Sequence, residues 1–228
     1  MIYEEDIATI VAIIYDKNSG DNDKVIKDLY WKKKKTTYKS ITVTCLDVIK
    51  VNVLSVSGYK ILLEKRGSES KIVEIFHVCN WKGNEIPQSD LQFVNIYNEV
   101  IKNAPKKNIL IQSTQGTGAR VYMLTYFACI YDALKSDRDI DCPITVIKSI
   151  RDGRYRGNLV PYKFAYMIKA LVTAFFNNRI LIDFSQRRTD FTSSYDSYFY
   201  DYLKRSDKMN EFFKKFLEFV NIVDEEKM

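Results

Sequence analysis

The positions of hydrophobic and polar residues predict strands in the first third of the chain. Ile7 to Tyr15 is a compact run rich in β-branched side chains, which is typical of a buried strand. A polar loop is expected at residues 16–23, and the alternation further along predicts a meander of strands. The expected strands of this meander are Ile41–Val43, Asp47–Val56, Gly58–Leu63 and Lys71–Val78.

Later in the chain, apolar residues recur at helical spacing. After an irregular segment at residues 81–88, four helices are expected, with a short strand, Ile109–Ile111, between the first two. The expected helices are Leu91–Ile101, Val121–Leu134, Ile144–Ile150 and Tyr162–Phe176. The second of them is apolar on most faces and is therefore predicted to be central and buried. Strands followed by helices predict an α/β (α+β) fold with a central, twisted mixed sheet flanked by helices.

The character of the sequence changes at residue 177, so we expect a domain at residues 1–176 and a C-terminal extension at residues 177–228. Residues 185–197 are polar and are expected to form loops. An amphipathic helix is expected near residues 207–223, with Asp207 at its N-cap. Its apolar side chains are Phe212, Phe213, Phe216, Phe219, Val220 and Val223. We favour docking of this helix on its own domain, with binding to a partner as the alternative.

Two polar segments each allow two interpretations. The stretch Y-D-S-Y-F-Y-D-Y at residues 195–202 mixes tyrosines with acids, a context that tyrosine kinases often accept, but a packed aromatic cover is the favoured interpretation. Four consecutive lysines at residues 32–35 are interpreted as a solvated turn. Contact with an anionic membrane or a phosphopeptide is the alternative for these lysines.

Composition and charge exclude several classes of protein. A net charge of +6 over 228 residues falls short of the dense basic stripes of a nucleic-acid binder. The four cysteines have no C-x-x-C spacing and there is one histidine, so we expect reduced, mostly buried thiols and neither a metal nor a cofactor. No apolar run reaches the roughly 18 residues of a membrane span, and the acidic start is unlike a signal peptide. These features predict a soluble, cytoplasmic protein.

The richest stretch for chemistry is N-I-L-I-Q-S-T-Q-G-T-G-A-R-V, residues 108–121. It predicts an apolar strand, a loop of small residues and a long helix, which together direct backbone N–H groups and a helix N-terminus at one point. Such a point attracts anions, and phosphate above all. The loop nevertheless contains no cysteine, histidine or lysine, so the reactive side chains of a phosphate enzyme are missing.

These elements, in this order, resemble the protein tyrosine phosphatase family over residues 1 to about 176. The segment A-T-I-V at residues 8–11 resembles the family's first core strand, and Tyr30-Trp31 its Y-W landmark. The family pattern F-H-x-x-x-W-P-D-x-x-x-P, which opens a mobile acid-bearing loop, is matched by Phe76-His77, Trp81 and Pro87. Residues 151–166 resemble the region of the family's catalytic glutamines and the helix after it. The signature H-C-x-x-G-x-G-R falls on Gln112, Ser113, Thr114, Gln115, Gly116, Thr117, Gly118 and Ala119, with Arg120 next.

The departures from this pattern fall on the reactive groups. The resemblance implies a cysteine thiolate as nucleophile, and its position here is Ser113, whose hydroxyl is far harder to ionise. The preceding family histidine is Gln112, so no base is available there. The arginine that grips the phosphoryl oxygens is Ala119. Arg120 is next to it, but one step along a helix turns a side chain by about 100°, so we do not expect it to take over without remodelling.

The residues expected for acid catalysis depart from the family pattern as well. In the W-K-G segment of Trp81, Lys82 and Gly83, the family's general-acid aspartate is replaced by Gly83. Glu85 and Asp90 lie nearby in the sequence, off the required position. The catalytic glutamines have no clear match, because G-N-L-V fills residues 157–160.

The simultaneous loss of the nucleophile, of the arginine that binds the phosphoryl oxygens and of the general acid implies a pseudophosphatase with no catalytic residues, because such groups act as a unit. The resemblance also implies a domain without the family's N-terminal helices and phosphotyrosine-recognition loop. The expected function is a regulatory or protein-interaction module that binds proteins weakly, tyrosine-phosphorylated ones among them. The oligomeric state stays open.

Two alternatives remain: an altered phosphatase that uses Arg120 with Glu85 or Asp90, and a degenerate relic with a scaffold role. His77 and Trp81 are interpreted as packing residues, and Ser113 as either a phosphate contact or a tolerated loop residue.

Overall fold

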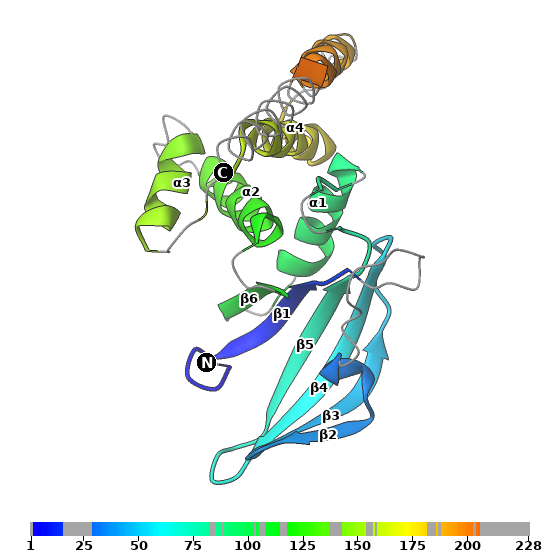
Figure 1. The fold of residues 1–228 in the computed structure, drawn as a ribbon, viewed down its shortest axis with the longest axis vertical. Coiled ribbons are helices and arrows are strands. Elements are labelled where there is room, and N and C mark those ends of the chain that lie inside the picture. Colours follow the sequence, from blue (N-terminus) through cyan, green and yellow to red (C-terminus); the bar gives the residue numbers. More distant parts are fainter. Residues whose placement is uncertain are drawn as a thin grey trace, which may run out of the picture.

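The computed structural model describes residues 2–15, 29–82, 85–87, 89–102, 104, 108–114, 118–136, 143–153, 157, 159–181, 186, 188–202 and 204–205. Six strands form one mixed sheet, and the helices gather beside β1 and β6 while the other strands extend away from them (Figure 1). The strands are β1 (Ile7–Ile13), β2 (Lys35–Tyr38), β3 (Ile41–Ile49), β4 (Val56–Lys65), β5 (Lys71–Val78) and β6 (Asn108–Ser113). The expected mixed sheet flanked by helices is confirmed.

Strand β1 is the centre of the sheet's parallel part. The strand order is β2-β3-β4-β5-β1-β6, in which β2 to β5 form an antiparallel meander and β1 runs parallel to both β5 and β6. Val11 and Ile13 face a core shared with the helices, whereas Ile10 and Ala12 face a second core on the opposite side of the sheet. Burial on both faces explains why this segment is an uninterrupted apolar run.

The helices occur where their periodicity predicts them. They are α1 (Asp90–Ile96), which continues into a π-helical turn (Tyr97–Ile101), then α2 (Ala119–Lys135), α3 (Pro143–Asp152) and α4 (Pro161–Asn177). A short 3-10 turn, Tyr30–Lys32, precedes β2. As expected, α2 is buried on most faces.

The meander differs from the prediction in two places. Residues 41–49 form one strand, because the register shift between Cys45 and Asp47 interrupts the alternation without ending the pairing with β4. The predicted strand from Asp47 ends at Ile49, and the chain turns before β4 through Ser55, whose φ is +61°. Strand β2 was not predicted, since its mostly exposed K-T-T-Y sequence has no apolar face.

The expectation of loops at residues 185–197 is wrong, because residues 188–202 are helical. Phe191, Tyr195 and Phe199 are spaced four residues apart along this helix. The rings of Phe191 and Tyr195 are tilted, with centroids 6.0 Å apart, and those of Tyr195 and Phe199 are stacked, with centroids 5.9 Å apart. An ion pair of 2.5 Å between Lys169 Nζ and Asp196 Oδ1 joins the helix to α4. Packing against α4 thus overrides the low helix propensity of the polar residues. The amphipathic helix expected at 207–223 lies outside the described residues.

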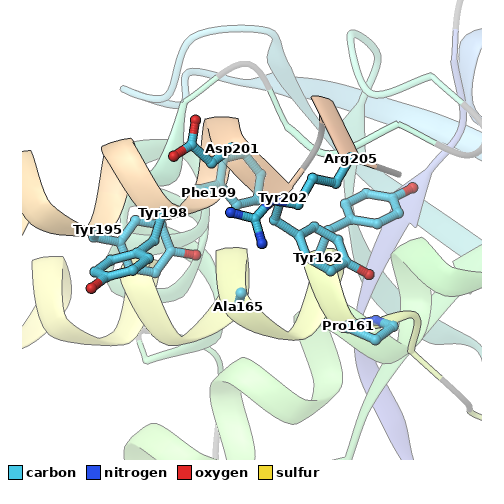
Figure 2. Close-up of a pocket in the computed structure, with 9 residues that line it drawn as sticks. All are labelled: Pro161, Tyr162, Ala165, Tyr195, Tyr198, Phe199, Asp201, Tyr202 and Arg205. Atoms are coloured by element: carbon cyan, nitrogen blue, oxygen red, sulfur yellow. The ribbon is translucent and has the colours of Figure 1, made fainter. Parts of the chain in front are cut away.

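A groove of about 480 Å³ runs between α4 and this last helix (Figure 2). Tyr162 and Ala165 of α4 face it from one side, and Tyr198 and Tyr202 from the other. The tyrosine-rich stretch is therefore only in part an aromatic cover, since Tyr198 is 80% exposed.

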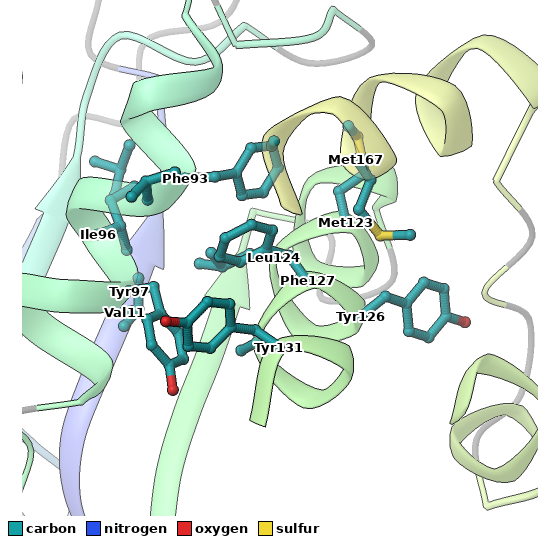
Figure 3. Packing of buried hydrophobic residues seen from close by; sticks show 14 of the residues in the cluster. Val11, Phe93, Ile96, Tyr97, Met123, Leu124, Tyr126, Phe127, Tyr131 and Met167 are labelled. Carbon is teal, nitrogen blue, oxygen red and sulfur yellow. The ribbon is translucent and has the colours of Figure 1, made fainter. Parts of the chain in front are cut away.

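Aromatic side chains fill the core between the sheet and α1, α2 and α4 (Figure 3). Phe93 lies at its centre, 1% exposed, with its ring 5.3 Å from those of Trp81 and Phe127 and 6.0 Å from that of Tyr166. One aromatic residue of α1 thus joins the segment after β5 to both α2 and α4. In the part of the chain described above, no helix is long and apolar enough to cross a membrane.

Candidate functional site

The candidate loop starts at Ser113, the last residue of β6, and leads to Gly118, the N-cap of α2. Ser113 is 9% exposed, and a Cβ added at Gly118 would lie 3.5 Å from its Oγ. The hydroxyl therefore faces the N-terminus of α2. Within the described residues nothing hydrogen-bonds this Oγ. Thr114 is exposed and Ala119 half-buried, while Gln115, Gly116 and Thr117 lie outside the described residues.

The N-terminus of α2 carries no compensating negative group. Gly118 provides no side-chain cap, and the first turn of the helix contains no acidic residue. The first N–H groups of a helix lack partners within it, and the helix dipole places partial positive charge there. The start of α2 therefore has the electrostatic character on which the prediction of an anion site depends, and the site itself stays a prediction.

Gln112, which the sequence predicts to stand at the position of the family's histidine, is directed to Tyr30. Its side chain hydrogen-bonds Tyr30, which lowers the pKa of that phenol, although burial raises the pKa more strongly. The amide of Gln112 provides no base for Ser113.

Arg120 is the second residue of α2 and is buried, with 9% of its surface exposed. Its Nη1 donates a hydrogen bond of 2.7 Å to the carbonyl oxygen of Trp81. Its Nε is buried and has no partner among the described residues. Burial lowers the pKa of the guanidinium. Arg120 thus links the start of α2 to the segment that the sequence predicts to be the former acid loop.

Trp81 anchors that segment in the core. Its side chain is 1% exposed, lies edge-on to Phe93, and donates from Nε1 to the carbonyl oxygen of Glu85 at 2.8 Å. Lys82 lies with Nζ 5.9 Å from the ring centre of Tyr15. Pro87 is buried, and Gly83 lies outside the described residues. Trp81 packs as expected for an anchor.

Asp90 and Glu85, the two acids that an altered phosphatase could use, have different surroundings. Asp90 accepts a hydrogen bond of 2.7 Å at Oδ2 from Thr173 Oγ1 in α4. Its charge also helps to raise the pKa of Tyr166, after the larger effect of burial. Asp90 therefore joins α1 to α4. Glu85 is exposed, and its backbone carbonyl rather than its carboxylate contacts Trp81.

Lys163, in the first turn of α4, is a residue of this region that the sequence interpretation missed. It is 5% exposed, and its Nζ lies 5.6 Å from the ring centre of Tyr162. Burial, and then the nearby charge of Arg120, lower the pKa of its ammonium group. A signal was present in the sequence: Lys163 shares helical spacing with the buried residues Tyr166, Met167 and Ala170.

The single histidine is a packing residue, as predicted. His77 is 1% exposed, its Nε2 lies 2.7 Å from the carbonyl oxygen of Ile14, and its ring is 5.5 Å from that of Trp31. The described cysteines, Cys45, Cys79 and Cys129, are free thiols, but they are half-buried rather than mostly buried as expected. No group of three or more potential metal ligands occurs in the described parts of the chain.

Strand β6, which runs parallel to β1 and leads to the buried helix α2 beside a segment anchored by Trp81, defines an α/β protein. The family model described as protein-tyrosine phosphatase matches residues 1–173, so the chain belongs to the protein tyrosine phosphatase family. The receptor-type tyrosine-protein phosphatase C of Rattus norvegicus is 24% identical over 211 residues, 86% of this chain and 16% of the relative.

Solved structures of the family share the fold. The tyrosine phosphatase TbPTP1 of Trypanosoma brucei superposes with a TM-score of 0.64 at 15% identity, covering 75% of this chain and 62% of that one. A structure of PTPN18 in complex with HER2-pY1248 phosphopeptides has a TM-score of 0.61 at 14% identity, covering 76% and 65%. The chain therefore spans less than two thirds of these proteins and a small part of the receptor.

Proposed function

We propose that this chain is a catalytically inactive member of the family, a regulatory or protein-interaction module that binds tyrosine-phosphorylated proteins weakly. The observation that carries the proposal is Ser113 at the end of β6. Its buried Oγ faces the N-terminus of α2, with no base hydrogen-bonded to it in the described part of the chain. An alkoxide is far harder to form than the cysteine thiolate of the family signature.

The surroundings of Ser113 support the proposal. Ala119 offers no guanidinium for the equatorial oxygens of a transferring phosphoryl group, whereas charge-assisted contacts are the main source of catalysis in such reactions. Arg120 has one donor engaged by Trp81. The position assigned to the general acid is Gly83, which has no side chain to donate a proton.

Phosphotyrosine is the partner chemistry that fits best, since the related PTPN18 structure holds phosphopeptides of HER2. Backbone N–H groups at the start of α2 remain available for a phosphoryl group, but a missing arginine removes a charge-assisted contact of about 1.5–3 kcal/mol. We therefore expect phosphotyrosine to bind weakly to this chain. A cytoplasmic location is part of the proposal, supported by the free thiols, which are typical of a reducing compartment.

An altered phosphatase is the rival function, and the surroundings of Asp90 argue against one version of it. The carboxylate is bonded to Thr173 on α4 and serves the contact between two helices. Glu85 is exposed and remains the acid available to the rival. The remaining alternative, a relic with a scaffold role, predicts no binding of phosphotyrosine.

Incubation of the pure protein with an aryl phosphate and with phosphotyrosine peptides tests the proposal. We expect no phosphate release above buffer, together with weak calorimetric binding that needs the phosphate of the peptide. Turnover that disappears in Arg120→Ala, but persists in the exposed control Lys148→Ala, would establish the altered phosphatase instead. Absence of binding at millimolar peptide would leave the scaffold role.

A further inference from the structure

Strand β2 is an open edge of the sheet, on the side that lies away from the helices (Figure 1). Among the described strands it pairs with β3 alone, and Lys35, which the sequence predicts to lie in a solvated turn, is its first residue. The backbone N–H of Cys45 donates a hydrogen bond of 3.1 Å to the carbonyl oxygen of Lys34, so these residues form a hydrogen-bonded pair of the ladder. Because such pairs alternate in an antiparallel ladder, the backbone N–H and C=O groups of Lys35 and Thr37 point away from β3. They form an edge to which another strand can pair.

This edge of the sheet is strongly basic. Between residues 30 and 45 the sequence contains five lysines, at residues 32–35 and 39, and no acid. All five lysines are exposed. Arg66 adds a charge beside the turn that joins β2 to β3, where its backbone N–H donates to the carbonyl oxygen of Ser40 at 3.4 Å. A second basic strand would be repelled by this edge, whereas an acidic strand would be attracted to it.

A groove of about 560 Å³, lined mostly by apolar side chains, lies beside the edge on one face of the sheet. Tyr38 of β2 lines the groove and is 45% exposed. The next two strands contribute Val43 and Leu63, which are paired with each other. Side chains alternate along a strand, so Lys35 and Thr37 face the side opposite to Tyr38. The side chains of an added strand would alternate in the same way, between the groove and the face that carries Lys35.

The described acids around this edge are fewer than its lysines. Asp47 lies further along β3, and its Oδ1 accepts a hydrogen bond of 2.8 Å from the backbone N–H of Val48. Glu64 of β4 is two strands further into the sheet than β2. Glu4 lines the groove together with Lys65, so the charges of these two residues offset each other. The edge therefore keeps an excess of positive charge.

We propose that the edge of β2 binds an extended, acidic protein segment as an additional strand. The backbone of the segment pairs with Lys35 and Thr37, its carboxylates lie beside the lysines, and its apolar side chains enter the groove. In this mode of recognition main-chain pairing supplies affinity and side-chain pockets supply specificity. The basic edge excludes a second copy of the same edge as the occupant. Strands β2 and β6 are at opposite ends of the sheet, so this surface is separate from the candidate loop and goes beyond the proposed function.

Fluorescence anisotropy of a labelled peptide of alternating glutamate and valine, added to the full chain, tests this surface. We expect saturable binding that weakens at higher salt, because exposed charges are screened. A copy of the peptide with alternate amides N-methylated should bind at least about tenfold more weakly, since it lacks the donors that pair with the edge. A peptide of alternating lysine and valine should not bind.

Variants of β2 separate backbone pairing from charge. Thr37→Pro removes the outward N–H group without removing a hydrogen bond to β3, so it should weaken binding at least about tenfold. Thr37→Val, which keeps the N–H group, is the matched control and should bind the peptide like wild type. Lys35→Glu should weaken binding by about fivefold. Lys148→Glu, at an exposed position of α3, should leave it unchanged.

Three outcomes overturn the proposal. The first is equal binding of the N-methylated copy, or equal binding by Thr37→Pro once circular dichroism shows that this variant folds. The second is absence of binding at millimolar peptide. The third comes from vesicles that contain phosphatidylserine: binding that Lys35→Glu weakens and Thr37→Pro leaves unchanged, without binding of the peptide, assigns the lysines to an anionic membrane. None of these probes carries phosphotyrosine, so their failure is distinguishable from failure of the proposed function.

Discussion

At the scale of single residues, two buried polar atoms near the start of α2 have no hydrogen-bond partner among the residues that the structure describes. These atoms are Ser113 Oγ and Arg120 Nε, and the charge of Arg120 helps to lower the pKa of the buried Lys163, after the larger effect of burial. Native proteins leave few buried polar atoms unsatisfied, and those that remain often mark a site for a ligand. If Ser113, Ala119 and Gly83 hold the family's reactive positions, as proposed, binding rather than phosphoryl transfer is the chemistry expected of this region.

The double substitution Ser113→Cys with Ala119→Arg is expected to restore measurable turnover of an aryl phosphate, whereas each single substitution stays near background. The cysteine thiolate needs the arginine to bind the phosphoryl oxygens, and the arginine needs a nucleophile, so the effects are strongly non-additive. Phosphate release by the four proteins, measured side by side, checks this. Equal rates in all four would show that residues 113 and 119 do not hold the positions assigned to them.

Lys163 should give the stability of the protein a distinct pH dependence. Burial lowers its pKa in the folded protein below the ordinary value of 10.5. Between the lowered pKa and pH 10.5, the unfolded chain therefore binds more protons than the folded one. The free energy of unfolding then rises with pH through that window. Urea unfolding between pH 7 and about 10 should show this rise in wild type relative to Lys163→Met. The same pH slope in both proteins would contradict a buried, charged Lys163.

The positions of Ser113, Trp81 and His77 could be predicted from the sequence because each belongs to a local pattern of strand, loop and helix. The electrostatic interaction between Arg120 and Lys163 could not, because the two residues are 43 positions apart in the sequence and interact only once α2 and α4 pack together. The burial of Lys163 was nevertheless readable from its helical spacing. This spacing does not show that Arg120 interacts with Lys163.

At the scale of secondary structure elements, the last described helix depends on aromatic packing against α4. Phe199→Ala is expected to lower the free energy of unfolding by about 1–3 kcal/mol, less than the 3–5 kcal/mol of a fully buried phenylalanine. Tyr198→Ala is the matched control one residue earlier, since Tyr198 is 80% exposed and a change within about 0.5 kcal/mol is expected. Urea unfolding followed by circular dichroism measures both. A larger loss for Tyr198→Ala would mean that the helix presents its other face to α4.

Two elements show why patterns in the sequence fail at particular places. Polar Ser and Thr residues around Phe191 and Tyr195 indicate loops when read alone, but the aromatic spacing of four residues is satisfied once α4 is present. Strand β2 has no apolar face, so its place beside β3 follows from backbone pairing and not from side-chain pattern. Both errors reflect tertiary contacts that local propensity does not record.

At the scale of the whole molecule, two hydrophobic cores on opposite faces of the sheet hold the fold together. Phe93→Ala in the helix-side core is expected to lower the free energy of unfolding by about 3–5 kcal/mol, because its ring contacts Trp81, Phe127 and Tyr166. Leu91→Ala in the same helix, 44% exposed, should cost far less. Denaturant midpoints measured for the two variants check this. Similar losses would place the centre of the core elsewhere.

The sheet, its flanking helices and the family were all predictable from the sequence, because the landmarks occur in the order that the topology requires. Strand β1 carries most of this information, since burial between β5 and β6 demands the apolar run at residues 7–13. The absence of catalysis is a proposal of another kind. It depends on Ser113, Ala119 and Gly83 standing at the family's reactive positions.

The most direct test of that proposal compares wild type with Ser113→Ala in a phosphate-release assay on a phosphotyrosine peptide. If the chain is a non-catalytic module, the two proteins release phosphate at the same rate as buffer, at every enzyme concentration. Release by wild type that rises with its concentration and is abolished in Ser113→Ala would show instead that the serine is a working nucleophile, and the chain an enzyme.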